Sequence, residues 1–96
     1  MTTLPKKVSM EHIGSIIKEE VYHVFPNTTV TVCLIKLKNN TNVVGYNYGA
    51  VDPDEHSFER GKTEARAAAI NKIWELETYL LREAKHLETD RQNEAD

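Results

Sequence analysis

The feature that most constrains this chain is a run of β-branched and aliphatic residues at positions 28–38. Alternation along a strand places Val32 and Leu34 on one face and Cys33 and Ile35 on the other. Both faces are apolar, which predicts a strand covered on two sides, by helices of this chain or by a second copy. The rest of the chain must therefore supply much of that cover.

A turn rich in asparagine follows the strand at residues 39–42, and residues 43–50 have the pattern of a returning strand. Asparagine tolerates positive φ, so this composition predicts an antiparallel β-hairpin. A two-stranded hairpin is not stable by itself in water, and it needs a further strand or a helix packed on it.

A long helix is the predicted partner of the hairpin. It is expected to begin between Asp54 and Ser57, after a turn at residues 52–54, and to end near Leu87. Apolar and small residues form one stripe along it, which consists of Phe58, Ala65, Ala69, Ile73, Leu76, Leu80 and Leu87. A second stripe of Ile70, Trp74 and Leu81 predicts a second packing partner, and we expect a homodimer or a larger homo-oligomer.

Small residues recur at every fourth position at the start of this helix, at Gly61, Ala65 and Ala69. Such a row lets another backbone approach closely. It has two interpretations, tight packing on the hairpin or a helix interface between protomers.

A short N-terminal helix is predicted from Ser9, a capping residue, to about Glu20, and Pro26 prevents helix at Phe25. Residues 1–96 are thus expected to form one α+β domain. It comprises a short N-terminal helix, an antiparallel β-hairpin and a long C-terminal helix packed on the hairpin, and it is completed by oligomerisation. Residues 1–8 and 88–96 are expected to be disordered.

The composition excludes several classes of protein. The chain has 96 residues, a mass of 11.0 kDa and one cysteine, so it has no internal disulfide and little room for a deep private active site. No apolar run is long enough for a signal peptide or a membrane span, and the net charge of -3 argues against binding of duplex DNA or RNA by bulk charge. A reducing cytoplasm is the expected compartment.

Candidate catalytic and metal-binding residues are few. Cys33 lies among apolar neighbours and is interpreted as a packed core thiol, while the four histidines lack the paired spacing of zinc hydrolases. Asp52, Asp54 and His56 alternate in a loop, but the glycine and distal glutamate of a calcium loop are missing, which favours turn and capping roles. We expect no enzyme, no cofactor and no metal.

One cluster between residues 46 and 66 combines aromatic rings, amides, a carboxylate and cations. An anionic nucleotide would use such a mixture, with cations and a helix N-terminus for phosphate, a ring for the base and Asp or Asn for ribose hydroxyls. The alternative is a solvated helix start. The candidate ligand-binding residues are Asn47, Tyr48, Asp52, Phe58, Arg60, Lys62 and Arg66. Of these, Phe58 or Tyr48 is the candidate ring for the base.

Two segments resemble a known family. Residues 31–39, Gly45 and the turn at residues 50–53 are similar to the hairpin of the phage gene 49/gene 66 family, a family of small tailed-phage proteins. Residues 61–81, from Gly61-Lys62 through Lys72-Ile73-Trp74 to Leu81, resemble its helix pattern. The chain departs from that pattern at residues 46–49, where the family has smaller polar residues.

The resemblance implies a phage protein, and one branch of the family is similar to the Thoeris anti-defence sponge proteins. Those proteins sequester a cyclised ADP-ribose signal, and some also hold cyclic oligonucleotides, without turnover and as symmetric oligomers. The expected function is sequestration of a small cyclic nucleotide in the host cell cytoplasm. The alternative is a protein interaction module that binds a host or phage protein through Trp74, Tyr79 and Leu81.

Overall fold

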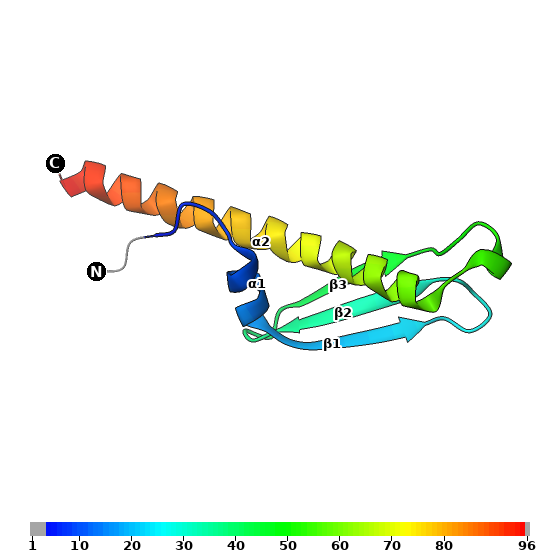
Figure 1. Cartoon of the computed structure of the whole chain (residues 1–96). Coiled ribbons are helices and arrows are strands. Elements are labelled where there is room, and N and C mark those ends of the chain that lie inside the picture. Colours follow the sequence, from blue (N-terminus) through cyan, green and yellow to red (C-terminus); the bar gives the residue numbers. More distant parts are fainter. Residues whose placement is uncertain (1–3, 96) are drawn as a thin grey trace.

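Three antiparallel strands, in the order β1-β2-β3, form one sheet that a long helix crosses (Figure 1). The computed structural model describes residues 4–95, so the expectation of disorder at residues 1–3 and 96 lies outside the described part. The elements are α1 (Met10–Ile16), β1 (Ile17–Val24), β2 (Thr31–Leu37), β3 (Asn42–Asn47), the 3₁₀ turn η1 (Pro53–Glu55) and α2 (Phe58–Ala95). The predicted α+β class is confirmed, with a short N-terminal helix, antiparallel strands and a long C-terminal helix.

Strand β1 corrects the prediction for the N-terminal region. Ser9 caps α1 as predicted, because its Oγ accepts a hydrogen bond from the His12 N–H at 3.1 Å. The helix ends at Ile16, however, and not near Glu20, and the chain continues directly into a strand. The reason is tertiary: β2 has two edges, and β1 satisfies the backbone groups of the edge that β3 leaves open.

Helix α2 covers one face of the sheet. Cys33 and Ile35 of β2 are fully buried beneath it, together with Ala65, Ala69 and Ile73. The opposite face of the sheet carries exposed apolar side chains at Val21, Val44 and Tyr46. Among the described residues, helix therefore covers one of the two apolar faces of β2 and leaves the other partly exposed.

The turn between β2 and β3 follows the prediction. Asn40 has a φ of 70°, and Asn39 Oδ1 accepts a hydrogen bond from the Thr41 N–H at 3.0 Å. Strand β3 is shorter than predicted, because it ends at Asn47 and not at residue 50.

The small residues of α2 pack against the backbone of β3. A Cβ at Gly45 would lie 2.2 Å from both the Ala65 carbonyl oxygen and the Ala69 nitrogen, and both alanines are fully buried. This contact confirms the first of the two interpretations of the small-residue row, tight packing on the hairpin.

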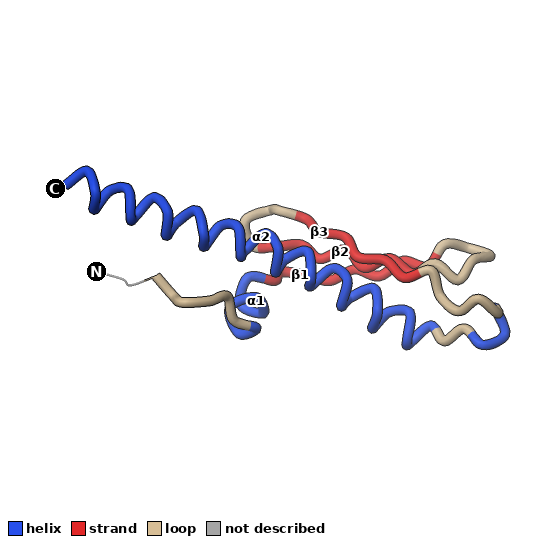
Figure 2. Tube along the Cα trace, turned by 90° about the horizontal axis from the view of Figure 1, so that it is seen from above, coloured by secondary structure: helices blue, strands red, loops and turns tan. Residues whose placement is uncertain are grey.

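The molecule is elongated, because α2 has 38 residues and runs on past the sheet (Figure 2). Its extents are 66 × 23 × 18 Å and its radius of gyration is 18.0 Å, against about 12–13 Å for a compact domain of this length. The helix continues beyond the predicted end at Leu87 to Ala95. On this projecting half, Leu76, Leu80 and Leu87 are half or more exposed.

No helix of the described residues combines the length and the apolar character needed to cross a membrane.

Residues 4–9, called the N-terminal arm below, run beside the projecting half of α2 (Figures 1 and 2). Two contacts hold this region to α2. The Lys85 Nζ donates a hydrogen bond to the Lys6 carbonyl oxygen at 3.2 Å, and His12 Nε2 of α1 lies 3.1 Å from Glu77 Oε2.

Candidate functional site

A cleft lies where the loop after β3 meets the first turns of α2, and it is called the α2 cleft below. Its volume is about 310 Å³. Two of the predicted ligand-binding residues line it, Asn47 from the end of β3 and Arg60 from the first turn of α2. The remaining lining residues are Gly49, Ala50, Glu55, His56, Ser57, Gly61 and Glu64.

His56 is held in the wall of this cleft by two glycines. A Cβ at Gly49 would lie 2.7 Å from His56 Nδ1, and one at Gly61 would lie 3.4 Å from His56 Cε1. Gly49 also has a φ of 85°, which side chains rarely tolerate. The imidazole packs edge-on against Phe58, with ring centroids 4.7 Å apart.

Two buried polar atoms near Gly61 lack a hydrogen-bond partner among the described residues. They are His56 Nε2 and Thr31 Oγ1, and the Thr31 side chain is fully buried at the start of β2. An unpaired buried polar atom costs free energy. Of the two residues, only His56 lines the α2 cleft.

The start of α2 adds oriented backbone groups to this cleft. Ser57 Oγ accepts a hydrogen bond from the Arg60 N–H at 3.3 Å, which caps the helix. The N-terminal end of a helix favours anions, and the Arg60 guanidinium adds a positive charge there. Glu55 and Glu64 also line the cleft, and carboxylates accept hydrogen bonds from ribose hydroxyls.

Arg66, one of the predicted ligand-binding residues, forms an ion pair with Glu20 of β1. Its Nε donates to Glu20 Oε1 at 2.7 Å and its Nη2 to Glu20 Oε2 at 3.4 Å, which ties α2 to β1. This guanidinium lowers the pKa of Glu20, and the Tyr22 hydroxyl also donates to Glu20 Oε1, at 3.0 Å. Arg66 therefore does not line the α2 cleft and already has an anionic partner.

The two predicted aromatic residues lie outside the α2 cleft. Tyr48 is 69% exposed and lies beside Tyr46, with ring centroids 5.1 Å apart, and hydrogen bonding to Tyr46 raises the pKa of Tyr48. Phe58 lines a separate surface hollow with residues 27–30 and His56. His56 is thus the residue that the α2 cleft and this hollow share.

Asp52 and Lys62 complete the predicted set. Asp52 Oδ1 accepts a hydrogen bond from the Asp54 N–H at 3.0 Å, which is the turn role that the spacing favoured. Lys62 is exposed on α2 and does not line the cleft.

Cys33 has the surroundings of a core thiol. It is fully buried beneath α2, and burial raises the pKa of its thiol. Burial and the bond to Glu20 also raise the pKa of nearby Tyr22, to about 12. Within residues 4–95, no three His, Cys, Asp or Glu side chains lie close enough together to hold a metal ion.

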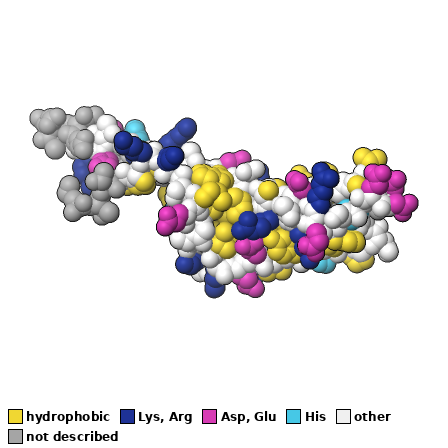
Figure 3. Space-filling view, viewed as in Figure 1, with side chains coloured by type: hydrophobic (Ala, Val, Ile, Leu, Met, Phe, Trp, Pro, Cys, Tyr) yellow, Lys and Arg dark blue, Asp and Glu magenta, His cyan; other side chains and the backbone are white. Residues whose placement is uncertain are grey.

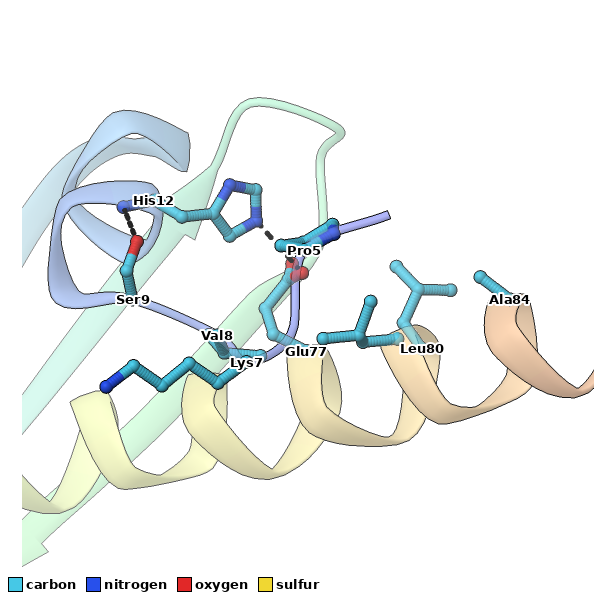
Figure 4. Close-up of a pocket in the computed structure, with 9 residues that line it drawn as sticks. Pro5, Lys7, Val8, Ser9, His12, Glu77, Leu80 and Ala84 are labelled. Carbon is cyan, nitrogen blue, oxygen red and sulfur yellow. Dashed lines mark hydrogen bonds and ion pairs between the residues drawn. The ribbon is translucent and has the colours of Figure 1, made fainter. Parts of the chain in front are cut away.

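A second hollow, of about 420 Å³, lies between the N-terminal arm and α2 (Figure 4). Leu80 and Ala84 of α2 form much of its apolar wall, and the His12–Glu77 contact crosses one end. None of the predicted ligand-binding residues lines this hollow.

His56 and Ser57 line the cleft but were not among the ligand-binding residues predicted from the sequence. The sequence does contain a pattern that could have indicated them. His56 stands directly before Ser57, a residue type that caps helices, and Gly49 and Gly61 flank this pair. Spacing alone could not assign these glycines to one side chain, since both lie against His56 only in the folded chain.

Comparison with known proteins found one family. A family model described as "Phage protein (N4 Gp49/phage Sf6 gene 66) family" matches residues 8–85. No curated protein and no solved structure matches the chain significantly.

Proposed function

Because the chain belongs to the N4 Gp49/phage Sf6 gene 66 family of phage proteins, we propose that it is a phage accessory protein acting on a host defence signal. It binds a nucleotide signal made by the host, such as a cyclic ADP-ribose isomer or a cyclic oligonucleotide, and sequesters it without turnover. Its place of action is the host cell cytoplasm during infection.

The observation that carries this proposal is the composition of the α2 cleft. Arg60 and the helix N-terminus offer a place for phosphate, and Asn47 with Glu64 offers partners for ribose hydroxyls. His56, whose Nε2 is buried and has no partner among the described residues, also lines this cleft.

Storage suits this cleft better than catalysis does. A nucleophile needs a base within hydrogen-bond distance, and no hydrogen bond among the described side chains joins Ser57 or Cys33 to a basic group. The volume of about 310 Å³ is at the lower limit for ligand pockets, so a second copy of the chain would complete the enclosure.

The test is a thermal-shift panel of cyclic ADP-ribose isomers, cyclic dinucleotides, cyclic trinucleotides and linear nucleotides. A ligand at 100 times its Kd adds about 2.7 kcal/mol of apparent stability, which raises the Tm of a domain of this size by at least several degrees. Recovery of the intact ligand after denaturation distinguishes storage from hydrolysis.

Arg60→Glu is the variant that links such a shift to the α2 cleft, and Lys72→Glu is its matched control on the same helix outside the cleft. We expect Arg60→Glu to remove most of the ligand-induced shift and Lys72→Glu to preserve it. Flat melting curves across the whole panel would contradict the proposal for those ligands.

The second candidate is a protein interaction module that binds through α2. It is favoured by the exposure of Tyr79, at 69%, on the projecting half, whereas Trp74 and Leu81 are partly buried. An infection assay in a host that carries the defence system separates the two functions. Loss of protection with Tyr79→Glu and its retention with Arg60→Glu would favour the interaction module.

A further inference from the structure

A larger hollow lies on the other side of the N-terminal arm, and its near end, at Trp74, is about 21 Å along α2 from Arg60. Its volume is about 810 Å³. Four cations line it, Lys6 and Lys7 from the arm and Arg82 and Lys85 from α2. These four residues together with Trp74 and Thr78 are called the basic groove below.

The charge of the basic groove contrasts with that of the chain. The whole chain has a net charge of -3, yet none of the described residues that line this groove is Asp or Glu, whereas two glutamates line the α2 cleft. None of the four cations takes part in an ion pair among the side chains that the structure describes. Glu75 lines only the neighbouring hollow that shares Trp74, Thr78 and Arg82 with the groove. The groove is thus a local concentration of positively charged side chains.

Trp74 gives this groove an aromatic surface. The side chain is only partly buried, because it packs on the core with part of its surface and lines the groove with the rest. Trp74, Thr78, Arg82 and Lys85 follow one another at spacings of four, four and three residues, so they share one side of α2. Figure 3 shows hydrophobic side chains over the middle of α2, with Lys and Arg side chains beside them along its projecting half.

The N-terminal arm forms the opposite wall. The Lys85 Nζ donates to the Lys6 carbonyl oxygen at 3.2 Å, which holds the arm beside the helix. The Lys7 side chain extends along α2, as Figure 4 shows. Val8 and Met10 add apolar surface to the groove.

We propose that the basic groove is a second binding site, for a nucleoside polyphosphate. The base stacks on Trp74, and the phosphates lie among Lys6, Lys7, Arg82 and Lys85. Stacking on an aromatic ring and contacts from several cations each favour this ligand class, and the volume accommodates a whole nucleotide. The site is separate from the α2 cleft and does not rest on the function proposed for that cleft.

Trp74 makes this proposal directly measurable, because it is the only tryptophan of the chain. A base stacked on its ring quenches its fluorescence, whereas Glu64 and Arg60 of the α2 cleft lie about 15 and 21 Å along α2 from Trp74. We expect ADP to quench the tryptophan fluorescence in a saturable manner. Inorganic tripolyphosphate should displace ADP, and adenosine should bind more weakly than ADP by about tenfold or more.

Arg82→Glu/Lys85→Glu is the variant that tests the phosphate contacts, and Lys7→Glu tests the arm independently. We expect the double variant to weaken ADP binding by about tenfold or more and Lys7→Glu to weaken it by a smaller factor. Arg91→Glu, on the same projecting half but outside the groove, is the matched control and should leave the affinity unchanged. Circular dichroism of each variant checks that α2 is intact.

Three results would each overturn the proposal: no quenching by millimolar ADP, equal affinity for ADP and adenosine, or unchanged ADP affinity in both groove variants. Arg60→Glu keeps the two proposals distinguishable. It should remove the thermal shift produced by a ligand of the α2 cleft and leave the ADP titration of Trp74 as it is.

Discussion

Gly45 is the residue at which the packing of α2 on the sheet leaves least space. The backbone of α2 lies against the position that a side chain would take, because an added Cβ would be 2.2 Å from both the Ala65 carbonyl oxygen and the Ala69 nitrogen. Backbone atoms cannot move aside as a flexible side chain can. Gly45 is therefore required by close approach and not by a turn.

We expect Gly45→Ala to destabilise the protein by about 1–3 kcal/mol or more, the cost of overpacking a core. Gly14→Ala is the matched control, because no atom lies within 4 Å of the added Cβ and alanine favours helix by about 1 kcal/mol. Thermal unfolding followed by circular dichroism should show a lower Tm for the first variant and an equal or higher Tm for the second. A Gly45→Ala protein as stable as the original would contradict the close contact.

At the scale of elements, β1 depends on a contact that the sequence pattern did not indicate. The ion pair of Glu20 with Arg66 joins β1 to α2. Arg66 was a candidate for phosphate binding, but its guanidinium contacts Glu20 instead. The periodicity of residues 13–21 fits a helix equally well, so local pattern alone favoured the wrong element. Pairing with the open edge of β2 decided between them.

The stability of this junction should depend on pH in a defined direction. The Arg66 guanidinium lowers the pKa of Glu20 below its ordinary value of 4.5. The contribution of a carboxylate with a lowered pKa is fully present above pH 4.5 and is lost as the pH falls through the pKa of the folded state. We expect Glu20→Gln to cost about 0.5–1 kcal/mol near neutral pH, because both side chains are partly exposed, and progressively less in acid.

Urea denaturation between pH 7 and pH 3 measures this difference, and Glu19→Gln on the same strand is the control. Glu19 pairs with Lys36 at 3.4 Å and both side chains are well exposed, so its replacement should change stability little at any pH. A cost of Glu20→Gln that grew on acidification would contradict the assignment.

At the scale of the whole molecule, the elongated shape leaves large apolar side chains exposed on two surfaces. Leu76 and Leu80 continue the apolar side of α2 beyond the end of the sheet and are 50% and 60% exposed. Val44 and Tyr46 are exposed on the uncovered face of the sheet. Both surfaces support the homo-oligomer expected from the two apolar stripes, which stays a prediction.

Light scattering behind size exclusion tests this prediction at high micromolar concentration. We expect a mass at least twice the 11.0 kDa of one chain, because burial of the exposed leucines favours association. Leu76→Glu/Leu80→Glu should shift the protein toward the monomer, while Thr89→Glu, which adds a charge to an exposed polar position, should not. A mass of 11.0 kDa for the unsubstituted protein would contradict the predicted homo-oligomer.

The sequence by itself determined β2, its asparagine turn, the return of β3 and most of α2, because periodicity and turn chemistry are properties of neighbouring residues. It also determined that Cys33 is buried and that Asp52 serves a turn. Only the tertiary structure decided that residues 17–24 form a strand and that Asn47 and Arg60 share a cleft with His56. It also decided that Trp74 lies beside cations from the other end of the chain. The residues in each of these contacts lie in different segments of the sequence. They come together only because α2 packs on the sheet and the N-terminal arm packs on α2.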